Sequence, residues 1–170
     1  MIQKSEVTSH IHQAVIDTII RFATALDTNN WELYRSCFSD TVEVDYSDAL
    51  GLPSTKVNAD VWTSFARACC DPIQTFHVYT NFSVELNGDV AFVRNYHTSR
   101  HRRPNTTGGD QYTQYGWYET TLKNSEKGWV ISSLRHRIQW CDGNPLVVDS
   151  TTDDYKQAEA SVFGTKESSL

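Results

Sequence analysis

Residues 75–101 read TFHVYTNFSVELNGDVAFVRNYHTSRH, two β-type runs joined by Asn87-Gly88. Asn-Gly between such runs is the strongest short-range signal for a tight β-hairpin, because both residues tolerate a positive φ. Two more runs of the same kind follow, at 111–122 and 129–141. The second half of the chain is therefore expected to form a long antiparallel meander.

Helical spacing characterises the chain before this meander. Apolar residues recur every three or four positions from Ile11 to Leu26, which predicts a helix of roughly 20 residues. Asn30 and Asn58 are suitable N-caps for two further helices. Helices followed by a meander predict an α+β chain, with the helices packed on one face of a curved sheet.

A short strand is expected between the two N-caps. Residues 41–47, TVEVDYS, alternate between apolar and acidic side chains. This alternation places Val42, Val44 and Tyr46 on one face of the strand. The Tyr46 hydroxyl is therefore expected to point toward the same side as the core.

The 170-residue chain has the composition of one globular domain. Its 15 Lys and Arg residues against 21 Asp and Glu residues give a formal net charge of −6. That balance argues against a nucleic-acid-binding protein and against one held on an anionic membrane. Aromatic residues make up 12% of the chain, which favours a folded body that encloses something apolar.

No run approaches 18 apolar residues, and the first ten residues lack the apolar centre of a secretory signal. The four cysteines form neither a CxxC pair nor a metal-finger spacing. We therefore expect a cytoplasmic protein with reduced thiols. Periodicity fades toward the C-terminus, so we expect one domain, residues 1–141, and a tail, residues 142–170, that either covers a pocket or stays solvated.

Four polar residues, Asp27, Tyr46, His77 and His101, fall on faces that otherwise have a buried pattern. A buried carboxylate is costly unless it is paired, so Asp27 facing a histidine is the least costly arrangement. A carboxylate that fixes one imidazole beside a second histidine and a tyrosine can act in general acid–base catalysis. The alternative is a set of ordinary structural roles: a helix cap, a core tyrosine and satisfied sheet histidines.

The sequence predicts neither a metal site nor a bound cofactor. It contains no glycine-rich nucleotide loop, no nucleophile elbow and no HExxH motif. His97 and His101 share a strand face, but an extended strand separates them by about 13 Å. Two imidazoles that far apart are not joint ligands of one zinc ion.

The region from Phe22 to Trp140 resembles the scytalone dehydratase and SnoaL-like branch of the nuclear transport factor 2-like superfamily. The matching segments occur in the family's order and are ALDTNNW, LYRSCF, VEVDYSD, TFHVYTN, the end of YHTSRH, and GWVISSLRHRIQW. The resemblance implies a cone-shaped, strongly curved, mostly antiparallel sheet. In this fold the sheet wraps around N-terminal helices and encloses a deep pocket.

The resemblance also implies an activity and a set of site residues. In scytalone dehydratase the pocket binds a small cyclic hydroxy-ketone and removes water without a metal or an organic cofactor. The matching acid–base histidine is His77, and the second histidine, paired with an aspartate, is His101 with Asp27. One tyrosine that holds the substrate carbonyl through a water matches Tyr46. The other has no counterpart, because Leu26 occupies its position.

The wall of the pocket is less well defined by the sequence. The family's polar pair on the next strand matches Thr113 and Tyr115, or Tyr112 and Gln114 if the register slips by one residue. Neither register restores the family's residue types. The expected substrate-binding residues are Trp62, His97, Tyr112, Thr113, Tyr115 and Trp117.

The resemblance and the residues together predict a cofactor-independent dehydratase or isomerase for a small cyclic, carbonyl-bearing secondary metabolite. Two alternatives remain: an enzyme of rearrangement or cyclisation in a polyketide, terpenoid or alkaloid pathway, and a non-catalytic pocket or scaffold protein. Strands rich in Tyr, Trp and Val on both faces also predict a homo-oligomer, a dimer or trimer, formed through the outer face of the sheet.

Overall fold

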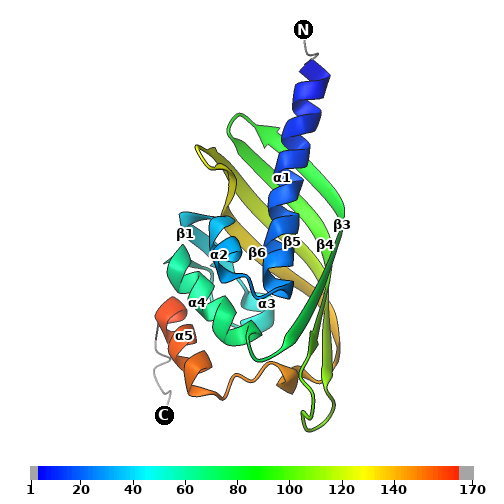
Figure 1. Cartoon of the computed structure of the whole chain (residues 1–170), viewed down its shortest axis with the longest axis vertical. Helices are drawn as coiled ribbons and strands as arrows, with labels where there is room; N and C mark the ends of the chain where they lie inside the picture. The colour runs from blue at the N-terminus through cyan, green and yellow to red at the C-terminus, as the bar shows by residue number, and fades with distance from the viewer. Residues whose placement is uncertain (1–3, 165–170) are drawn as a thin grey trace.

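The computed structural model describes residues 4–164 (Figure 1). The first half of the chain contains most of the helices: α1 (Lys4–Asp27), α2 (Trp31–Ser36), β1 (Phe38–Asp45), α3 (Ser47–Leu50), β2 (Thr55–Asn58) and α4 (Ala59–Cys70). The second half contains the meander and a return segment: β3 (Gln74–Asn87), β4 (Val90–Arg102), β5 (Gln111–Ser125), β6 (Gly128–Gly143), η1 (Pro145–Val147) and α5 (Asp153–Phe163).

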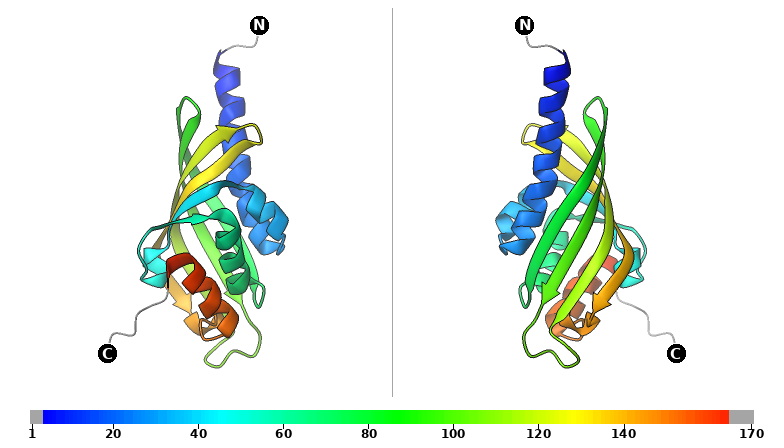
Figure 2. Two further views of the ribbon diagram at one scale, coloured as in Figure 1. Left: turned by 90° about the vertical axis from the view of Figure 1, so that its left-hand side faces the viewer. Right: turned by 90° about the vertical axis from the view of Figure 1, so that its right-hand side faces the viewer.

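The strands form one open, twisted sheet of six strands, in the order β2-β1-β6-β5-β4-β3. Neighbouring strands are antiparallel except for β1 and β6, which are parallel, so the sheet is mixed. The helices lie on one side of this sheet (Figures 1 and 2), which we call the inner face. The α+β class, the meander and the curved sheet packed on helices are thus confirmed.

The local signals in the sequence correspond to observed caps and turns. The side chain of Asn30 accepts a hydrogen bond from the backbone of Leu33, and that of Asn58 accepts one from Asp60. Gly88 has a φ of +59° in the β3–β4 hairpin. Elements α3 and β2 were not predicted, because four residues are too few to show a period.

The inner face of β4 changes from apolar to polar along its length. Near the hairpin the buried positions are Ala91 and Val93, and they pack in the main core beneath α1. The next buried positions, at the same two-residue spacing, are Asn95, His97 and Ser99. Buried polar side chains in succession are uncommon in a sheet, and they mark this end of the inner face as a candidate site.

The segment after β6 returns to the helices and packs beside α4. The ring centroid of Phe65 lies 5.5 Å from that of Tyr155 and 5.8 Å from that of Phe163. An ion pair of 3.2 Å between Arg103 and Asp149 ties the segment to the loop after β4. The division into residues 1–141 and a covering tail, 142–170, stays a prediction, and residues 165–170 lie outside the described part.

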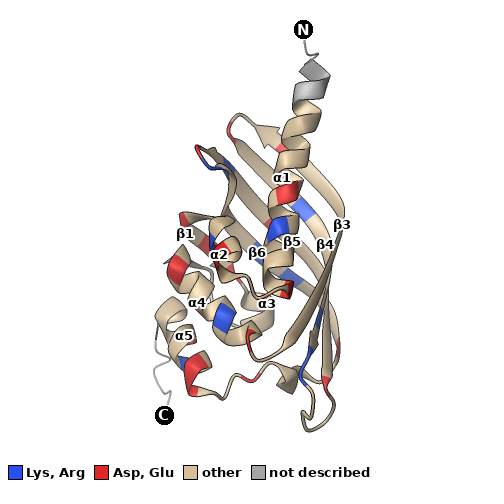
Figure 3. Ribbon diagram, viewed as in Figure 1, with Lys and Arg blue, Asp and Glu red and all other residues tan. Residues whose placement is uncertain are grey.

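Charged residues of both signs are interspersed over the ribbon, and no large basic area stands out in this view (Figure 3). Within residues 4–164, no helix is both long and apolar enough to cross a membrane.

Candidate functional site

A cavity of about 140 Å³ lies at the polar end of the inner face. Its wall is mostly apolar and aromatic, with contributions from α4, the Tyr46–Leu50 segment and the return segment. The polar side chains that line it include Tyr46, His77, Ser99, His101, Gln114 and His136. Three of the four predicted site residues therefore share one cavity, and the fourth, Asp27, is bonded to one of them.

Asp27 and His77 form a hydrogen-bonded pair at the edge of this cavity. The Nδ1 atom of His77 lies 2.6 Å from Oδ1 of Asp27, and the backbone N–H of His77 donates to Oδ2 at 2.9 Å. The hydroxyl of Thr75 donates to Oδ1 at 3.0 Å. Because a carboxylate accepts, Nδ1 of His77 carries a proton, and the lone pair of a neutral His77 ring is therefore on Nε2.

The predicted pairing of Asp27 with His101 is wrong. Asp27 is the last residue of α1, and it meets β3, which is an edge strand of the sheet. The free edge leaves the N–H of His77 without a strand partner, so Asp27 can satisfy both this N–H and the His77 ring. His101 lies on β4, with its ring centroid 6.1 Å from that of His77.

Protonation follows from these contacts. Burial would raise the pKa of Asp27, but hydrogen bonds from His77 and Thr75 hold that pKa below its ordinary value. Burial and the nearby His77 lower the pKa of His101 to about 4. His101 is therefore neutral at pH 7.

Tyr46 points into the cavity, although it lies just beyond the strand from which this was predicted. β1 ends at Asp45, and Tyr46 is the N-cap residue of α3. Its ring centroid lies 5.0 Å from that of Trp62 and 5.0 Å from that of His136. Burial raises the pKa of Tyr46 well above its ordinary value, so its hydroxyl is a neutral donor at pH 7.

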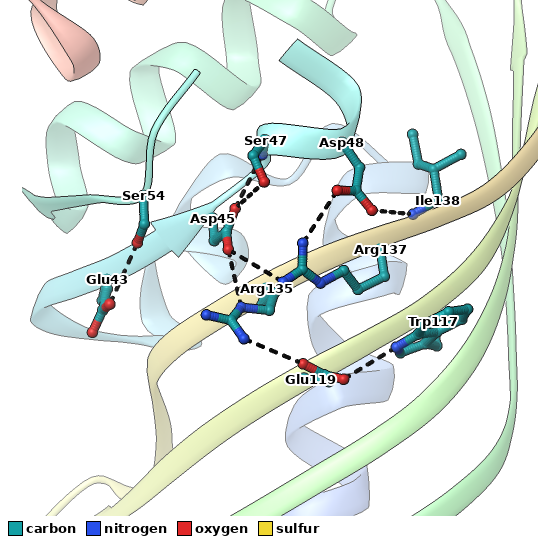
Figure 4. Close-up of polar contacts among 10 residues, drawn as sticks. All are labelled: Glu43, Asp45, Ser47, Asp48, Ser54, Trp117, Glu119, Arg135, Arg137 and Ile138. Carbon is teal, nitrogen blue, oxygen red and sulfur yellow. Dashed lines mark hydrogen bonds and ion pairs between the residues drawn. The ribbon is translucent and has the colours of Figure 1, made fainter. Parts of the chain in front are cut away.

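An ionic network on the other side of this segment holds it in place (Figure 4). Asp45 binds Arg135 at 3.0 Å and accepts the hydroxyl of Ser47 at 2.6 Å. Asp48 binds Arg137 at 3.1 Å, and its second oxygen accepts the N–H of Ile138 at 3.1 Å. These contacts fix α3 against β6, and with it the position of Tyr46.

Two buried histidines that face each other were not predicted as a unit. Nε2 of His136, on β6, lies 3.0 Å from Nε2 of His97, on β4, and Nδ1 of His97 lies 2.9 Å from the Ser99 hydroxyl. Gly116 stands beside His97 on the intervening strand β5. A Cβ at Gly116 would lie 1.8 Å from the carbonyl oxygen of Arg137, so only glycine fits here.

His136 could have been found from strand parity. In LRHRI (134–138), Arg135 and Arg137 belong on the outer side, which leaves Leu134 and His136 facing inward. Trp62 lines the cavity as predicted. His97 does not line it, but reaches it through His136.

The comparisons with known proteins agree with this architecture. A family model described as a SnoaL-like domain matches residues 8–135. The chain belongs to the SnoaL-like domain family. The resemblance stated from the sequence is thereby confirmed. Among curated proteins, no sequence matches this SnoaL-like protein significantly.

Solved structures of the same fold are similar to this SnoaL-like protein. Kfla4162 from Kribbella flavida has a TM-score of 0.77 and 21% identity, covering 79% of this chain and 95% of that one. A candidate scytalone dehydratase from Novosphingobium aromaticivorans has a TM-score of 0.72 and 17% identity, covering 82% and 91%. The hexachlorocyclohexane dehydrochlorinase LinA-type3 from Novosphingobium barchaimii has a TM-score of 0.66 and 14% identity, covering 79% and 90%.

Strand β5 of the SnoaL-like protein shows which register is correct. Gln114 and Tyr118 line the cavity, so even-numbered residues face inward. Tyr112 shares that side, with its ring centroid 6.0 Å from that of His101, but it is not part of the cavity wall. The alternative register, with Tyr112 and Gln114, is the observed one.

The expected wall positions at Thr113, Tyr115 and Trp117 are wrong, because strand alternation turns them to the outer face. Thr113 lies in a surface groove with Phe76 and Arg100. Tyr115 stacks on Trp140 with ring centroids 4.9 Å apart. The indole N–H of Trp117 donates to Glu119, and the guanidinium of Arg94 lies 4.7 Å from the Trp117 ring.

Within residues 4–164, no group of three His, Cys, Asp or Glu side chains is placed to share a metal ion.

Proposed function

We propose that this SnoaL-like protein is a cofactor-independent lyase or isomerase that removes a proton next to the carbonyl of a small cyclic substrate. The observation that carries the proposal is the 2.6 Å contact between Asp27 and His77 at the edge of a largely apolar cavity. Such a pair orients one imidazole and stabilises the positive charge that the imidazole gains when it takes up a proton.

His77 would act as the base through Nε2. Asp27 holds a proton on Nδ1, so the neutral ring would accept the substrate's proton on Nε2. Asp27 itself stays ionised at neutral pH, because its hydrogen bonds keep its pKa below the ordinary value. Its negative charge stabilises the imidazolium that forms during the reaction.

The proposed elimination needs only one proton carrier. Nε2 of His77 takes the proton from the carbon next to the carbonyl, and the electron pair moves to the carbonyl oxygen, where the Tyr46 hydroxyl stabilises the enolate. When the enolate collapses, the bond from the next carbon to its hydroxyl group breaks. That hydroxyl takes the proton from Nε2 and leaves as water. An isomerase would instead return the same proton to a different carbon.

The cavity limits the size of the substrate. A cavity of about 140 Å³ is close to the volume that holds a single benzene-sized ring. Apolar side chains such as Leu26, Leu50, Phe65 and Val148 suit the ring, and the polar groups at one end suit an oxygen function.

The solved relatives add support of a general kind. A dehydratase removes water and a dehydrochlorinase removes HCl, so both named chemistries combine loss of a proton with loss of a leaving group. An enzyme of rearrangement or cyclisation would use the same base, whereas a non-catalytic binding protein would have no catalytic base. Proton transfer to His77 therefore separates an enzyme from a non-catalytic protein.

The test is hydrogen–deuterium exchange at the carbon next to the carbonyl of cyclohexanone, followed by NMR in D₂O. Wild-type protein should accelerate exchange, and His77→Ala should lower the acceleration by about 10²–10⁴-fold. His10→Ala, which changes an exposed histidine of α1, should have no effect. No acceleration by the wild type, or more than about a tenth of it left in His77→Ala, would contradict the proposal.

A second probe, 3-hydroxycyclohexanone, distinguishes elimination from isomerisation. Elimination gives cyclohexenone, with a loss of about 18 Da that mass spectrometry detects, whereas isomerisation leaves the mass unchanged. Exchange with cyclohexanone but no mass loss with this probe would favour an isomerase.

A further inference from the structure

The His97–His136 pair has a proton arrangement that its neighbours determine. The two Nε2 atoms are 3.0 Å apart, so one donates and the other accepts. Nε2 of His97 also lies 3.4 Å from the carbonyl oxygen of Arg137, which can only accept. The proton therefore belongs on Nε2 of His97. The Ser99 hydroxyl then donates to Nδ1 of His97.

This arrangement fixes the tautomer of His136. Its Nε2 accepts from His97, so its own proton must be on Nδ1. Both rings are neutral at pH 7: burial lowers the pKa of His97 to about 4 and that of His136 well below its ordinary value. A neutral, fixed N–H donor thus exists at Nδ1 of His136.

That donor has no partner among the described residues. Nδ1 of His136 is buried and makes no hydrogen bond within residues 4–164. A buried donor without an acceptor destabilises the fold, and buried donors in native proteins are therefore normally hydrogen-bonded. His136 is 2% exposed, lines the cavity and lies beside Tyr46.

We propose that Nδ1–H of His136 binds the substrate's carbonyl oxygen, together with the hydroxyl of Tyr46. This inference rests on the proposed function, because it assumes that the cavity takes a carbonyl compound. His97 acts as a positioning residue, because it sets the tautomer of His136.

Two small ligands test the hydrogen bond without any turnover. Cyclohexanone and methylenecyclohexane have nearly the same shape, but only the ketone accepts a hydrogen bond. NMR titration of the wild type should show that the ketone binds at least about threefold more tightly, the range expected for one neutral hydrogen bond in a buried site. Equal affinities would overturn the proposal.

Two variants locate the donor on the ring. In His136→Asn the amide nitrogen stands near the place of Nδ1, and in His136→Gln it stands near the place of Nε2. The ketone preference should persist at the wild-type level in His136→Asn and fall in His136→Gln to the part that the Tyr46 hydroxyl supplies. The reverse result, or a wild-type preference in both variants, would overturn the assignment. Thermal melting of each variant shows that it is folded.

The tautomer is a further readout, observed by ¹⁵N NMR of histidine-labelled protein. In the wild type, His136 should carry its proton on Nδ1, and His97→Phe should give a mixture of tautomers. A proton on Nε2 of His136 in the wild type would contradict the inference. Ketone binding and the tautomer of His136 do not depend on proton transfer to His77. A failed hydrogen–deuterium exchange test would therefore reject the proposed reaction without rejecting the hydrogen bond from His136.

Discussion

The two faces of one sheet carry different kinds of side chain around the same strands. On the inner face, β3 and β6 contribute one buried or half-buried histidine each and β4 contributes two: His77, His136, His97 and His101. On the outer face, five large apolar side chains are between about two-fifths and three-fifths exposed: Phe76, Val78, Phe92, Tyr96 and Trp140.

The difference follows from alternation along the strands and from what covers each face. Helices cover the inner face, so its polar groups lose water and must bond to one another or to a ligand. Within the described residues, no element covers the outer apolar positions. The inner face is therefore suited to binding and chemistry, and the outer face to contact with a second protein surface.

The largest effect is expected for Asp27→Asn. The substitution keeps the shape of the side chain but removes the charge that orients and supports His77, so proton exchange should fall by about 10²–10⁴-fold. The cyclohexanone NMR assay measures this. Thr75→Val, which removes only the third hydrogen bond to the carboxylate, should be much milder. Equal losses in both variants would mean that the whole segment, rather than the charge, matters.

A smaller loss is expected for Tyr46→Phe. The change removes one donor to the developing enolate and leaves the ring packed between Trp62 and His136, so exchange should fall by about 10–10³-fold. Asp48→Asn tests the same residue from the outer side, because it weakens the link between α3 and Arg137. A fall in exchange with Asp48→Asn but none with Tyr46→Phe would exclude the hydroxyl.

The buried histidines should also make stability depend on pH. Unfolded histidines take up protons below about pH 6.5, whereas His97 and His101 do so in the folded protein only near pH 4. Stability should thus be full above pH 6.5 and fall between pH 6.5 and 4, by on the order of 2 kcal/mol for each histidine. Urea unfolding at pH 7.5, 6.0 and 4.5 measures this.

The matched variant for this prediction is His97→Gln with His101→Gln, which should make the pH dependence weaker. The slope that remains belongs to His136, because burial lowers its pKa as well. Asp27 contributes at lower pH, because its stabilising charge is lost only as the pH falls below its ordinary pKa of 3.8. An unchanged slope between pH 6.5 and 4 in the double variant would contradict the prediction.

The smallest effect on activity is expected for the outer face. We propose that a second copy of the chain covers it, giving a dimer or trimer. Phe92→Glu and Trp140→Glu should each reduce the particle to a monomer in light scattering, with exchange activity changed less than about twofold. Ile20→Glu, at an exposed apolar residue on α1, should leave the assembly intact. A monomeric wild type would contradict the proposal that a second copy of the chain covers the outer face.

The fold could be predicted from the sequence because its signals are local. Helical spacing from Ile11 to Leu26, the N-caps at Asn30 and Asn58, and the turn at Asn87-Gly88 each depend on a few neighbouring residues. All of them are observed. Strand parity would also have placed His136 on the inner face. On β5, however, the register was uncertain by one residue, and Thr113, Tyr115 and Trp117 were therefore assigned to the inner face although they lie on the outer face.

The sequence by itself determined the main helices and strands, their order, and the polar residues that fall on buried faces. Only the tertiary structure decided which of these polar side chains are hydrogen-bonded to each other. Asp27 meets His77 rather than His101 because α1 ends against an edge strand, and His97 reaches His136 because Gly116 leaves room across β5. Such pairings join residues 39 to 50 positions apart, and they depend on how helices and strands pack in space, which no local pattern encodes.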